Sequence, residues 1–294
     1  MTGRGPLVGA HMSVAGGLEK AVERGIAAGC RTIQLFTRNS NQWAGKPVSD
    51  QEATVFRAAA VTAGFSPLVS HSAYLINLGS SNPLIRSRSV AALRDELVRC
   101  HRLGIPFLVL HPGTHGGAGE KTGIDRIARG IDAALEAARV DGVDVLLETA
   151  AGQGACVGHS FGQLKAIRNR SSAPGRIAVC FDTCHVHAAG YDVVSTEGWR
   201  RTLDELDDQV GLSLVKVIHA NDSKQEQGCR VDRHERIGYG AMGEKAFVHV
   251  MRERAFREIP KILETPKDDA GAWDREGLAA LRRLAGRNSR NSGS

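Results

Sequence analysis

Three consecutive segments read FLVLHPG (107–113), GIDRIARGIDAALEAARV (123–140) and DVLLETA (144–150). The first and the third are short apolar runs with the length of a buried strand. The middle segment repeats its apolar residues at the spacing of one face of a helix. A strand, a helix and a second strand in this order predict a βαβ unit with parallel strands.

The same alternation continues over nearly the whole chain of 294 residues. Eight such units fit a closed barrel better than an open doubly wound sheet, because a barrel of this type takes about 250 residues. No stretch rich in Pro, Gly or Ser divides the chain. The sequence therefore predicts an α/β fold: a single (β/α)8 TIM barrel over residues 1–287, with a disordered polar tail at 288–294. The eight expected strands lie within LVGAHMS (7–13), TIQLF (32–36), PLVSHSAY (67–74), FLVLHPG (107–113), DVLLETA (144–150), IAVCFDTCH (177–185), LVKVIHAND (214–222) and PKILETP (260–266).

Composition and charge narrow the class of protein. No apolar run approaches the ~20 residues of a membrane span, and the first residues do not look like a signal peptide. The six cysteines follow no CxxC pattern, which is typical of reduced thiols in a cytosol. The net charge of +6 and the isoelectric point near 9.1 favour a polyanionic partner. We expect a soluble cytoplasmic monomer without membrane contact.

Seven of the eight expected strands are apolar at first and end on an ionisable residue. Parallel barrel strands all end at one face, so these side chains should meet in one small space. Imidazoles and carboxylates packed so closely need a cation between them, and this mixture without a thiolate pattern suits Zn²⁺ or Mn²⁺. The sequence predicts a polynuclear metal site. The seven residues are His11, His71, His111, Glu148, Asp182, His219 and Glu264.

Two short motifs enlarge this site. FDTCH separates Asp182 and His185 by three residues at a strand end, where the chain begins to turn, so the two side chains can face different metals. VDRH separates Asp232 and His234 by two residues. In extended chain such residues face the same side and can hold one ion, although an exposed polar loop would explain them equally well.

The chain resembles the endonuclease IV family of apurinic/apyrimidinic (AP) endonucleases. The similar segments occur in the family's order between residues 9 and 266, and FDTCH…AAGYD, HANDSK and VDRH are each specific. All of the segments are GAHMSVAGGL, HSAYLINLG, HPGTH, LLETAAGQG, FDTCHVHAAGYD, HANDSK, VDRH and LETP.

The resemblance implies three zinc ions per chain, with manganese as an alternative at one site. His71 and His111 would bind the first ion, and Glu148 would bridge it to the second. The second ion would also be bound by Asp182, His219 and Glu264, and the third by His185, Asp232 and His234. His11 and His115 would be phosphate-facing or would support the ligands.

The resemblance also implies the reaction and its substrate. The expected enzyme hydrolyses the phosphodiester bond 5′ to an abasic site in double-stranded DNA, leaves a 3′-hydroxyl and also trims blocked 3′ ends. This reaction belongs to base excision repair, in a prokaryote at the nucleoid. Glu148 and Glu264 would be catalytic, because they would orient a water molecule that the metals make acidic.

Three residues are expected to contact DNA. Tyr74 and Leu75 resemble residues that probe the minor groove in the family, although together with Ile76 they could instead cap the barrel core. Asn41 lies in the loop TRNSNQW (37–43), where well-known members have an arginine that enters the base stack. Tyr239 replaces a usual glutamate. Both departures bear on how the DNA is held.

Two other functions remain open at this stage. A metal-dependent sugar isomerase or epimerase of the same barrel superfamily would hold one or two metals and would lack the VDRH pair. A non-catalytic nucleic-acid-binding barrel would bind abasic DNA without cleaving it. Metal content separates the first from an endonuclease, and turnover separates the second.

Overall fold

Eight parallel strands close into a barrel in the computed structural model, which describes residues 5–286. Around the ring the order is β1-β12-β9-β8-β6-β4-β3-β2, so each strand pairs with its neighbours in the chain and the last pairs with the first. The predicted TIM barrel is therefore confirmed, whereas the predicted tail lies outside the described residues. The barrel strands are β1 (Val8–His11), β2 (Thr32–Leu35), β3 (Val69–His71), β4 (Phe107–Leu110), β6 (Asp144–Glu148), β8 (Ile177–Asp182), β9 (Val215–His219) and β12 (Lys261–Leu263).

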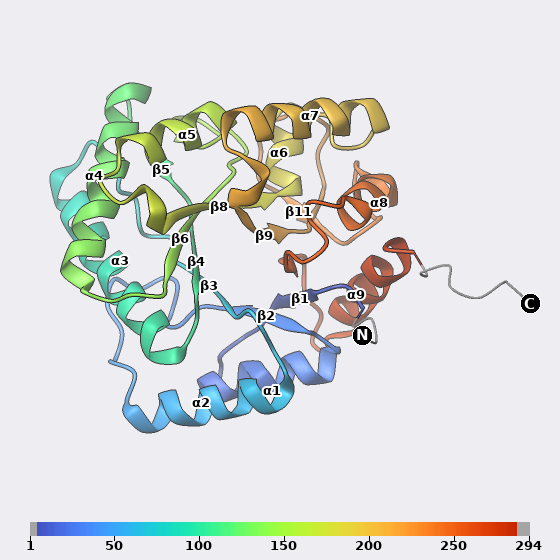
Figure 1. Cartoon of the computed structure of the whole chain (residues 1–294), viewed down its shortest axis with the longest axis horizontal. Helices are drawn as coiled ribbons and strands as arrows, with labels where there is room; N and C mark the ends of the chain where they lie inside the picture. The colour runs from blue at the N-terminus through green and yellow to red at the C-terminus, as the bar shows by residue number, and fades with distance from the viewer. Residues whose placement is uncertain (1–4, 287–294) are drawn as a thin grey trace, which may run out of the picture.

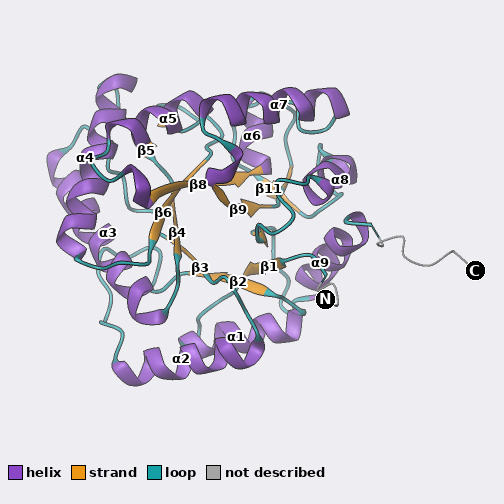
Figure 2. Ribbon diagram, viewed as in Figure 1, coloured by secondary structure: helices purple, strands orange, loops and turns teal. Residues whose placement is uncertain are grey.

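The helices form an outer ring around the strands (Figures 1 and 2). None of the helices within residues 5–286 combines the length and the apolar character that a membrane crossing requires. Two 3₁₀ turns, at Pro174–Arg176 and Leu212–Leu214, lead into β8 and β9. The α-helices are α1 (Leu18–Ala28), α2 (Asp50–Ala63), α3 (Pro83–Leu103), α4 (Glu120–Ala138), α5 (Phe161–Arg170), α6 (Thr183–Ala189), α7 (Thr196–Gln209), α8 (Gly243–Arg252) and α9 (Ala272–Leu284).

Local sequence signals set the ends of these helices. Ser49 caps α2, and Glu52 completes a capping box by accepting a hydrogen bond from the Ser49 backbone. Asn82 caps α3 directly before a proline, which suits the first turn of a helix. At the other end, Gly29 and Gly64 adopt the left-handed conformation that closes α1 and α2. The strands are thus joined by helices that begin and end where these caps lie.

Two short antiparallel pairs extend from the strand ends. β5 (Gly113–Thr114) pairs with β7 (Cys156–Val157), and β10 (Asp222–Ser223) pairs with β11 (His234–Glu235). The second pair brings the VDRH segment back beside the end of β9. This is how a loop residue such as His234 reaches the same region as the barrel strands.

Alternation along the strands divides the apolar residues into two groups. One large cluster lies between the strands and the helices, and a smaller one fills the inside of the barrel. Position 9 requires glycine, because a Cβ there would collide with the carbonyl oxygen of Thr32 on β2. The inner cluster consists of Val69, Val109, Leu146, Ala178, Cys180, Val217 and Ile262.

The six cysteines are all free. Cys156 and Cys229 are half-buried, and the other four are buried. Burial raises the pKa of Cys30 to about 11 and that of Cys180 to about 12, so both remain thiols near neutral pH. The geometry fits their role as small packing residues.

Leu146 offers a direct test of the inner cluster, since its side chain is fully buried. Leu146→Ala should lower the free energy of unfolding by about 2–5 kcal/mol, because the rigid barrel cannot collapse into the cavity. Urea unfolding in the presence of a chelator measures this value without a contribution from metal. Val61→Ala is the control, because Val61 is 79% exposed and should change stability little. Equal stabilities of the two variants would show that the barrel interior is not closely packed.

Candidate metal centre

The candidate site lies at the carboxyl ends of the barrel strands, which we call the mouth. In each strand that contributes an apolar residue to the inner cluster, the side chain two residues later also points into the barrel. Leu146 is thus followed by Glu148, and Val217 is followed by His219. The period of two in a strand explains why one apolar layer is covered directly by a layer of ionisable groups.

The first group gathers around one carboxylate oxygen. Oε2 of Glu148 lies 3.2 Å from Nε2 of His71 and 3.5 Å from Nε2 of His111. His71 donates from Nδ1 to the carbonyl of Ser72 at 2.7 Å, so its Nε2 is free to bind a metal. His71 and Glu148 are buried, and His111 is partly exposed. The group can hold one ion and remains open toward solvent.

The second group shares Glu148 with the first. Nδ1 of His219 lies 2.8 Å from the other carboxylate oxygen of Glu148 and 3.0 Å from Glu264. Asp182 lies 3.7 Å from the same nitrogen. Four potential ligand atoms therefore lie within 4.8 Å of one another. Glu148 can bridge two ions, one at each oxygen.

The third group combines a short helix with the β10–β11 pair. Nε2 of His185, in α6, lies 3.1 Å from Asp232 and 3.4 Å from Nε2 of His234. His185 donates from Nδ1 to the carbonyl of Thr149, so its Nε2 is also a free ligand atom. Asp232 lies 3.3 Å from Nε2 of His234. Two ring nitrogens and a carboxylate that converge in this way have the arrangement of a metal site.

Asp222 fixes the loop that follows the third group. Its buried carboxylate accepts hydrogen bonds from the backbone N–H groups of Ser223, Gly238, Gly240 and Met242, at 2.8–3.1 Å. A Cβ at Gly240 would collide with the carbonyl oxygen of Ser223, so a larger residue would disrupt this loop. Asp222 thus fixes this loop to β10, the strand that pairs with His234–Glu235.

The electrostatics of the cluster favour bound cations. Burial acts to raise the pKa of Glu148, but the facing histidines, His111 first, hold that pKa well below the usual value. Burial acts to lower the pKa of His185, but nearby carboxylates, Asp182 first, raise it well above the usual value. Without metal, protons on His185 and His219, whose pKa values the carboxylates raise, would compensate the buried carboxylates. A divalent ion can take the place of those protons.

The donor atoms fit zinc or a similar ion. All nine predicted ligands lie in the three groups, and Glu148 belongs to two of them. A further combination of Asp182, Cys184 and His234 is also compact. Asp182 and His234 of this combination already belong to the second and the third group, however. The three groups thus offer nitrogen and oxygen donors of the kind that zinc accepts.

Two buried amides at the mouth were not found by sequence reasoning. Asn221 donates to Asp182 at 2.7 Å and accepts from the backbone of Glu264 at 2.7 Å. Gln34, on β2, lies within hydrogen-bonding distance of Glu264 and His219. The alternation of inward and outward side chains could have indicated Gln34. It occupies the inward position at the end of β2, the one barrel strand with no ionisable residue there.

One buried carboxylate joins two loops of the mouth. Glu96, on α3, accepts from Nε of Arg38 at 2.9 Å and from the backbone of Ala73 at 3.2 Å. Arg38 belongs to the loop 36–49 after β2, and Ala73 to the loop 72–82 after β3. We call these two segments the rim loops. Glu96 fixes them relative to each other.

The predicted DNA-contacting residues lie on the rim loops with different exposure. Tyr74 is 60% exposed, and its ring centroid lies 5.6 Å from that of His71. Leu75 is half-buried and Ile76 is buried. Of these three residues, only Ile76 is purely a core residue. Asn41 is exposed.

The remaining predicted residues lie apart from these loops. His11 is in contact with Glu264 at the mouth, at 3.5 Å, whereas His115 accepts a hydrogen bond from the backbone of Gly119 in a turn. Tyr239 is exposed and bonds to Glu276, with the guanidinium of Arg236 over its ring.

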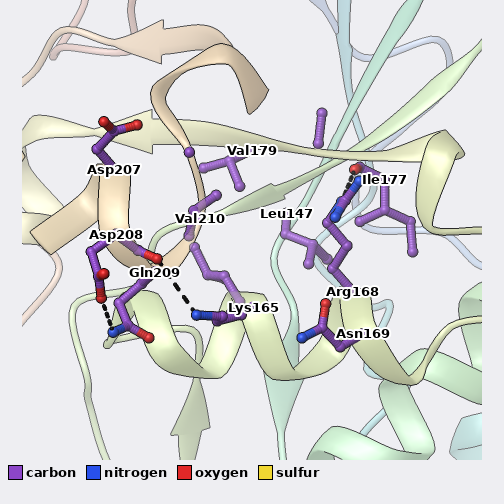
Figure 3. Close-up of a pocket in the computed structure, with 13 residues that line it drawn as sticks. Leu147, Lys165, Arg168, Asn169, Ile177, Val179, Asp207, Asp208, Gln209 and Val210 are labelled. Carbon is purple, nitrogen blue, oxygen red and sulfur yellow. Dashed lines mark hydrogen bonds between the residues drawn. The ribbon is translucent and has the colours of Figure 1, made fainter.

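A separate pocket of about 260 Å³ lies between α5 and α7 (Figure 3). None of the candidate ligands lines it. Its polar groups bond to one another, since Lys165 donates to the carbonyl of Asp208 and Gln209 donates to the Asp208 carboxylate. This pocket lies between two helices and is not part of the metal centre.

Comparisons with known proteins agree with this geometry. The family described as xylose isomerase-like TIM barrel matches residues 22–284. The "Probable endonuclease 4" of Geobacter sulfurreducens is 48% identical over 282 residues, covering 96% of this chain and 95% of that protein. The protein of the same name from Citrifermentans bemidjiense is 46% identical over 278 residues, covering 95% and 98%.

Solved structures give the same result. Endonuclease IV from Thermus thermophilus is 36% identical, covers 95% of this chain and 98% of its own, and superimposes with a TM-score of 0.85. A D-tagatose 3-epimerase-like protein has a TM-score of 0.72 at 16% identity, which shows a common fold alone. The chain belongs to the endonuclease IV family of metal-dependent AP endonucleases.

Proposed function

We propose that this enzyme hydrolyses the phosphodiester bond 5′ to an abasic site in duplex DNA and leaves a 3′-hydroxyl. Water adds to phosphorus, the bond from phosphorus to O3′ breaks, and O3′ takes up a proton. The observation that carries the proposal is the set of three ligand groups around buried Glu148 at the mouth of the barrel. The same site would trim blocked 3′ ends, because the bond to be broken is the same.

Three zinc ions per chain are the proposed cofactors, with manganese as an alternative at one position. His71, His111 and Glu148 would hold the first, and Glu148, Asp182, His219 and Glu264 the second. Bound ions of this kind lower the pKa of water and offset negative charge on a phosphate. The third group would be His185, Asp232 and His234.

Protein side chains would orient the reactants. Glu264 is 13% exposed at its side chain, so it faces the mouth and can accept a hydrogen bond from the attacking water. Glu148 holds the two groups on either side of it at a fixed separation. Partial desolvation of the ring beside the mouth, followed by the carboxylates Glu264 and Glu148, raises the pKa of the Tyr74 phenol to about 12. The phenol therefore keeps its proton near neutral pH and can donate a hydrogen bond to a phosphate.

The rim loops would hold the DNA. Tyr74 stands exposed above the first ligand group, where an aromatic ring can stack on a base or insert between bases. Leu75, next to Tyr74, and Asn41, on the other rim loop, would extend this surface. The +6 charge of the chain favours association with the phosphate backbone, and action on chromosomal DNA would place the enzyme in the cytoplasm.

Incision of a duplex that carries one abasic analogue tests the function. A denaturing gel should show a single cut 5′ to the analogue, with an upstream product that a polymerase can extend. Glu148→Gln keeps the shape of the side chain but removes the bridging charge, so cutting should fall by several orders of magnitude while DNA binding survives. Glu136→Gln, on an exposed part of α4, is the matched control and should cut normally. A Glu148→Gln enzyme with a tenth of normal turnover would contradict the bridging role.

The contribution of the rim loops can be measured separately from chemistry. Tyr74→Ala should weaken binding to abasic duplex by about 1–3 kcal/mol if the ring stacks or wedges. Asn41→Arg should tighten binding and steepen its salt dependence by up to about one phosphate contact. Affinities at several salt concentrations give both values.

Asn169→Arg is the matched control for charge, because Asn169 is exposed at the far end of α5. Saturated turnover should stay nearly unchanged in both rim-loop variants. If Tyr74→Ala and Asn41→Arg both bind as the unmodified enzyme does, the rim loops are not the DNA-binding surface.

A further inference from the structure

Gln34 occupies the one place at the mouth where a barrel strand ends on an amide. Its side chain is fully buried on β2 and lies among three residues of the centre. Nε2 of Gln34 lies 2.5 Å from Glu264 and 3.0 Å from Nδ1 of His11. Its Oε1 lies 2.8 Å from Nε2 of His219. One amide therefore contacts a carboxylate and two imidazoles at once.

The chemistry of the amide allows one arrangement of these contacts. A carboxylate only accepts hydrogen bonds, so the NH₂ group of Gln34 must face Glu264 and the oxygen must face His219. An amide oxygen also only accepts, so Nε2 of His219 must carry hydrogen. Nδ1 of His219 lies 2.8 Å from Glu148 and 3.0 Å from Glu264, so a cation held by these two carboxylates would take up the lone pair of this nitrogen. This is the form that binds a metal through Nδ1.

The second hydrogen of the same NH₂ group determines the state of His11. It points at Nδ1 of His11, so this nitrogen must accept, and a protonated His11 would set two N–H groups against each other. The proton of the neutral ring is therefore on Nε2. The ring of Phe36 packs against His11 at a centroid distance of 4.4 Å and restricts its rotation. The His11 side chain is 15% exposed, so its ring can contact a molecule bound at the mouth.

We propose that Gln34 is a positioning residue that fixes the tautomers of two histidines at once. It leaves Nδ1 of His219 free for a metal, and it makes Nε2 of His11 a hydrogen-bond donor toward an oxygen of the substrate phosphate. The second half of this inference rests on the proposed function, whereas the first concerns the protein alone. Gln34 touches no reacting atom and acts through these two rings.

Gln34→Leu removes all three hydrogen bonds at nearly constant volume. In the zinc-loaded protein, release of zinc to a chromophoric chelator should become about 10- to 100-fold easier at one site. Long-range ¹⁵N spectra of the histidines should show His11 as a mixture of tautomers instead of the Nε2–H form. Gln163→Leu is the matched control, because this buried glutamine bonds to the backbone of Gly158 and to Glu120, away from the centre. It should change neither the zinc release nor the tautomers.

Gln34→Glu separates the two halves of the inference and replaces the first variant if that one does not fold. A carboxylate can still accept from Nε2 of His219, but it cannot donate to His11. His219 should keep its Nε2–H tautomer, and His11 should no longer be fixed in its Nε2–H tautomer. Unchanged spectra and unchanged zinc release in both Gln34 variants would overturn the inference. An unmodified enzyme that fails to cut abasic DNA would refute the proposed function instead, and the tautomers of His11 would still be readable.

Discussion

The burial of the Glu148 carboxylate is the constraint on which the rest of the centre depends. A carboxylate with no exposure to water costs several kcal/mol unless positive charge compensates it. The chain surrounds Glu148 with imidazoles from β3, α6 and β9 and from the residue that follows β4, each within 3.5 Å of one of its oxygens. Both oxygens are used, and each belongs to a different ligand group. This arrangement would let a single residue organise two metal positions.

The barrel supplies this arrangement through its alternation. The inner apolar cluster supports the ionisable layer from below, so the ligands cannot sink into the interior. The third group is held differently, by α6 and by the β10–β11 pair. The Asp222 carboxylate fixes the loop that follows β11. Two groups thus depend on rigid strands and one on a braced loop. A loop-borne ligand pair can move more readily when a substrate enters or leaves.

Much of this could be predicted from the sequence because the pattern is local. Each barrel strand is a short apolar run, and its last inward residue is ionisable in seven strands, so His71 and Glu264 could be placed at one face without a structure. Gln34 was missed because an amide in TIQLF looks like an ordinary polar residue, although it stands at the same position along its strand as the ionisable residues. Glu96 was missed for another reason: its partners Arg38 and Ala73 lie on other segments, and only tertiary structure brings them to it.

The central claim is that one buried carboxylate organises a three-ion centre, and metal content tests it most directly. Elemental analysis of protein purified without chelators should give close to three ions per chain, mainly zinc, and Asp232→Ala should reduce the value to about two. Because the remaining two groups share Glu148, they should stay occupied in that variant. A reproducible value near one ion per chain in the unmodified protein would contradict the account.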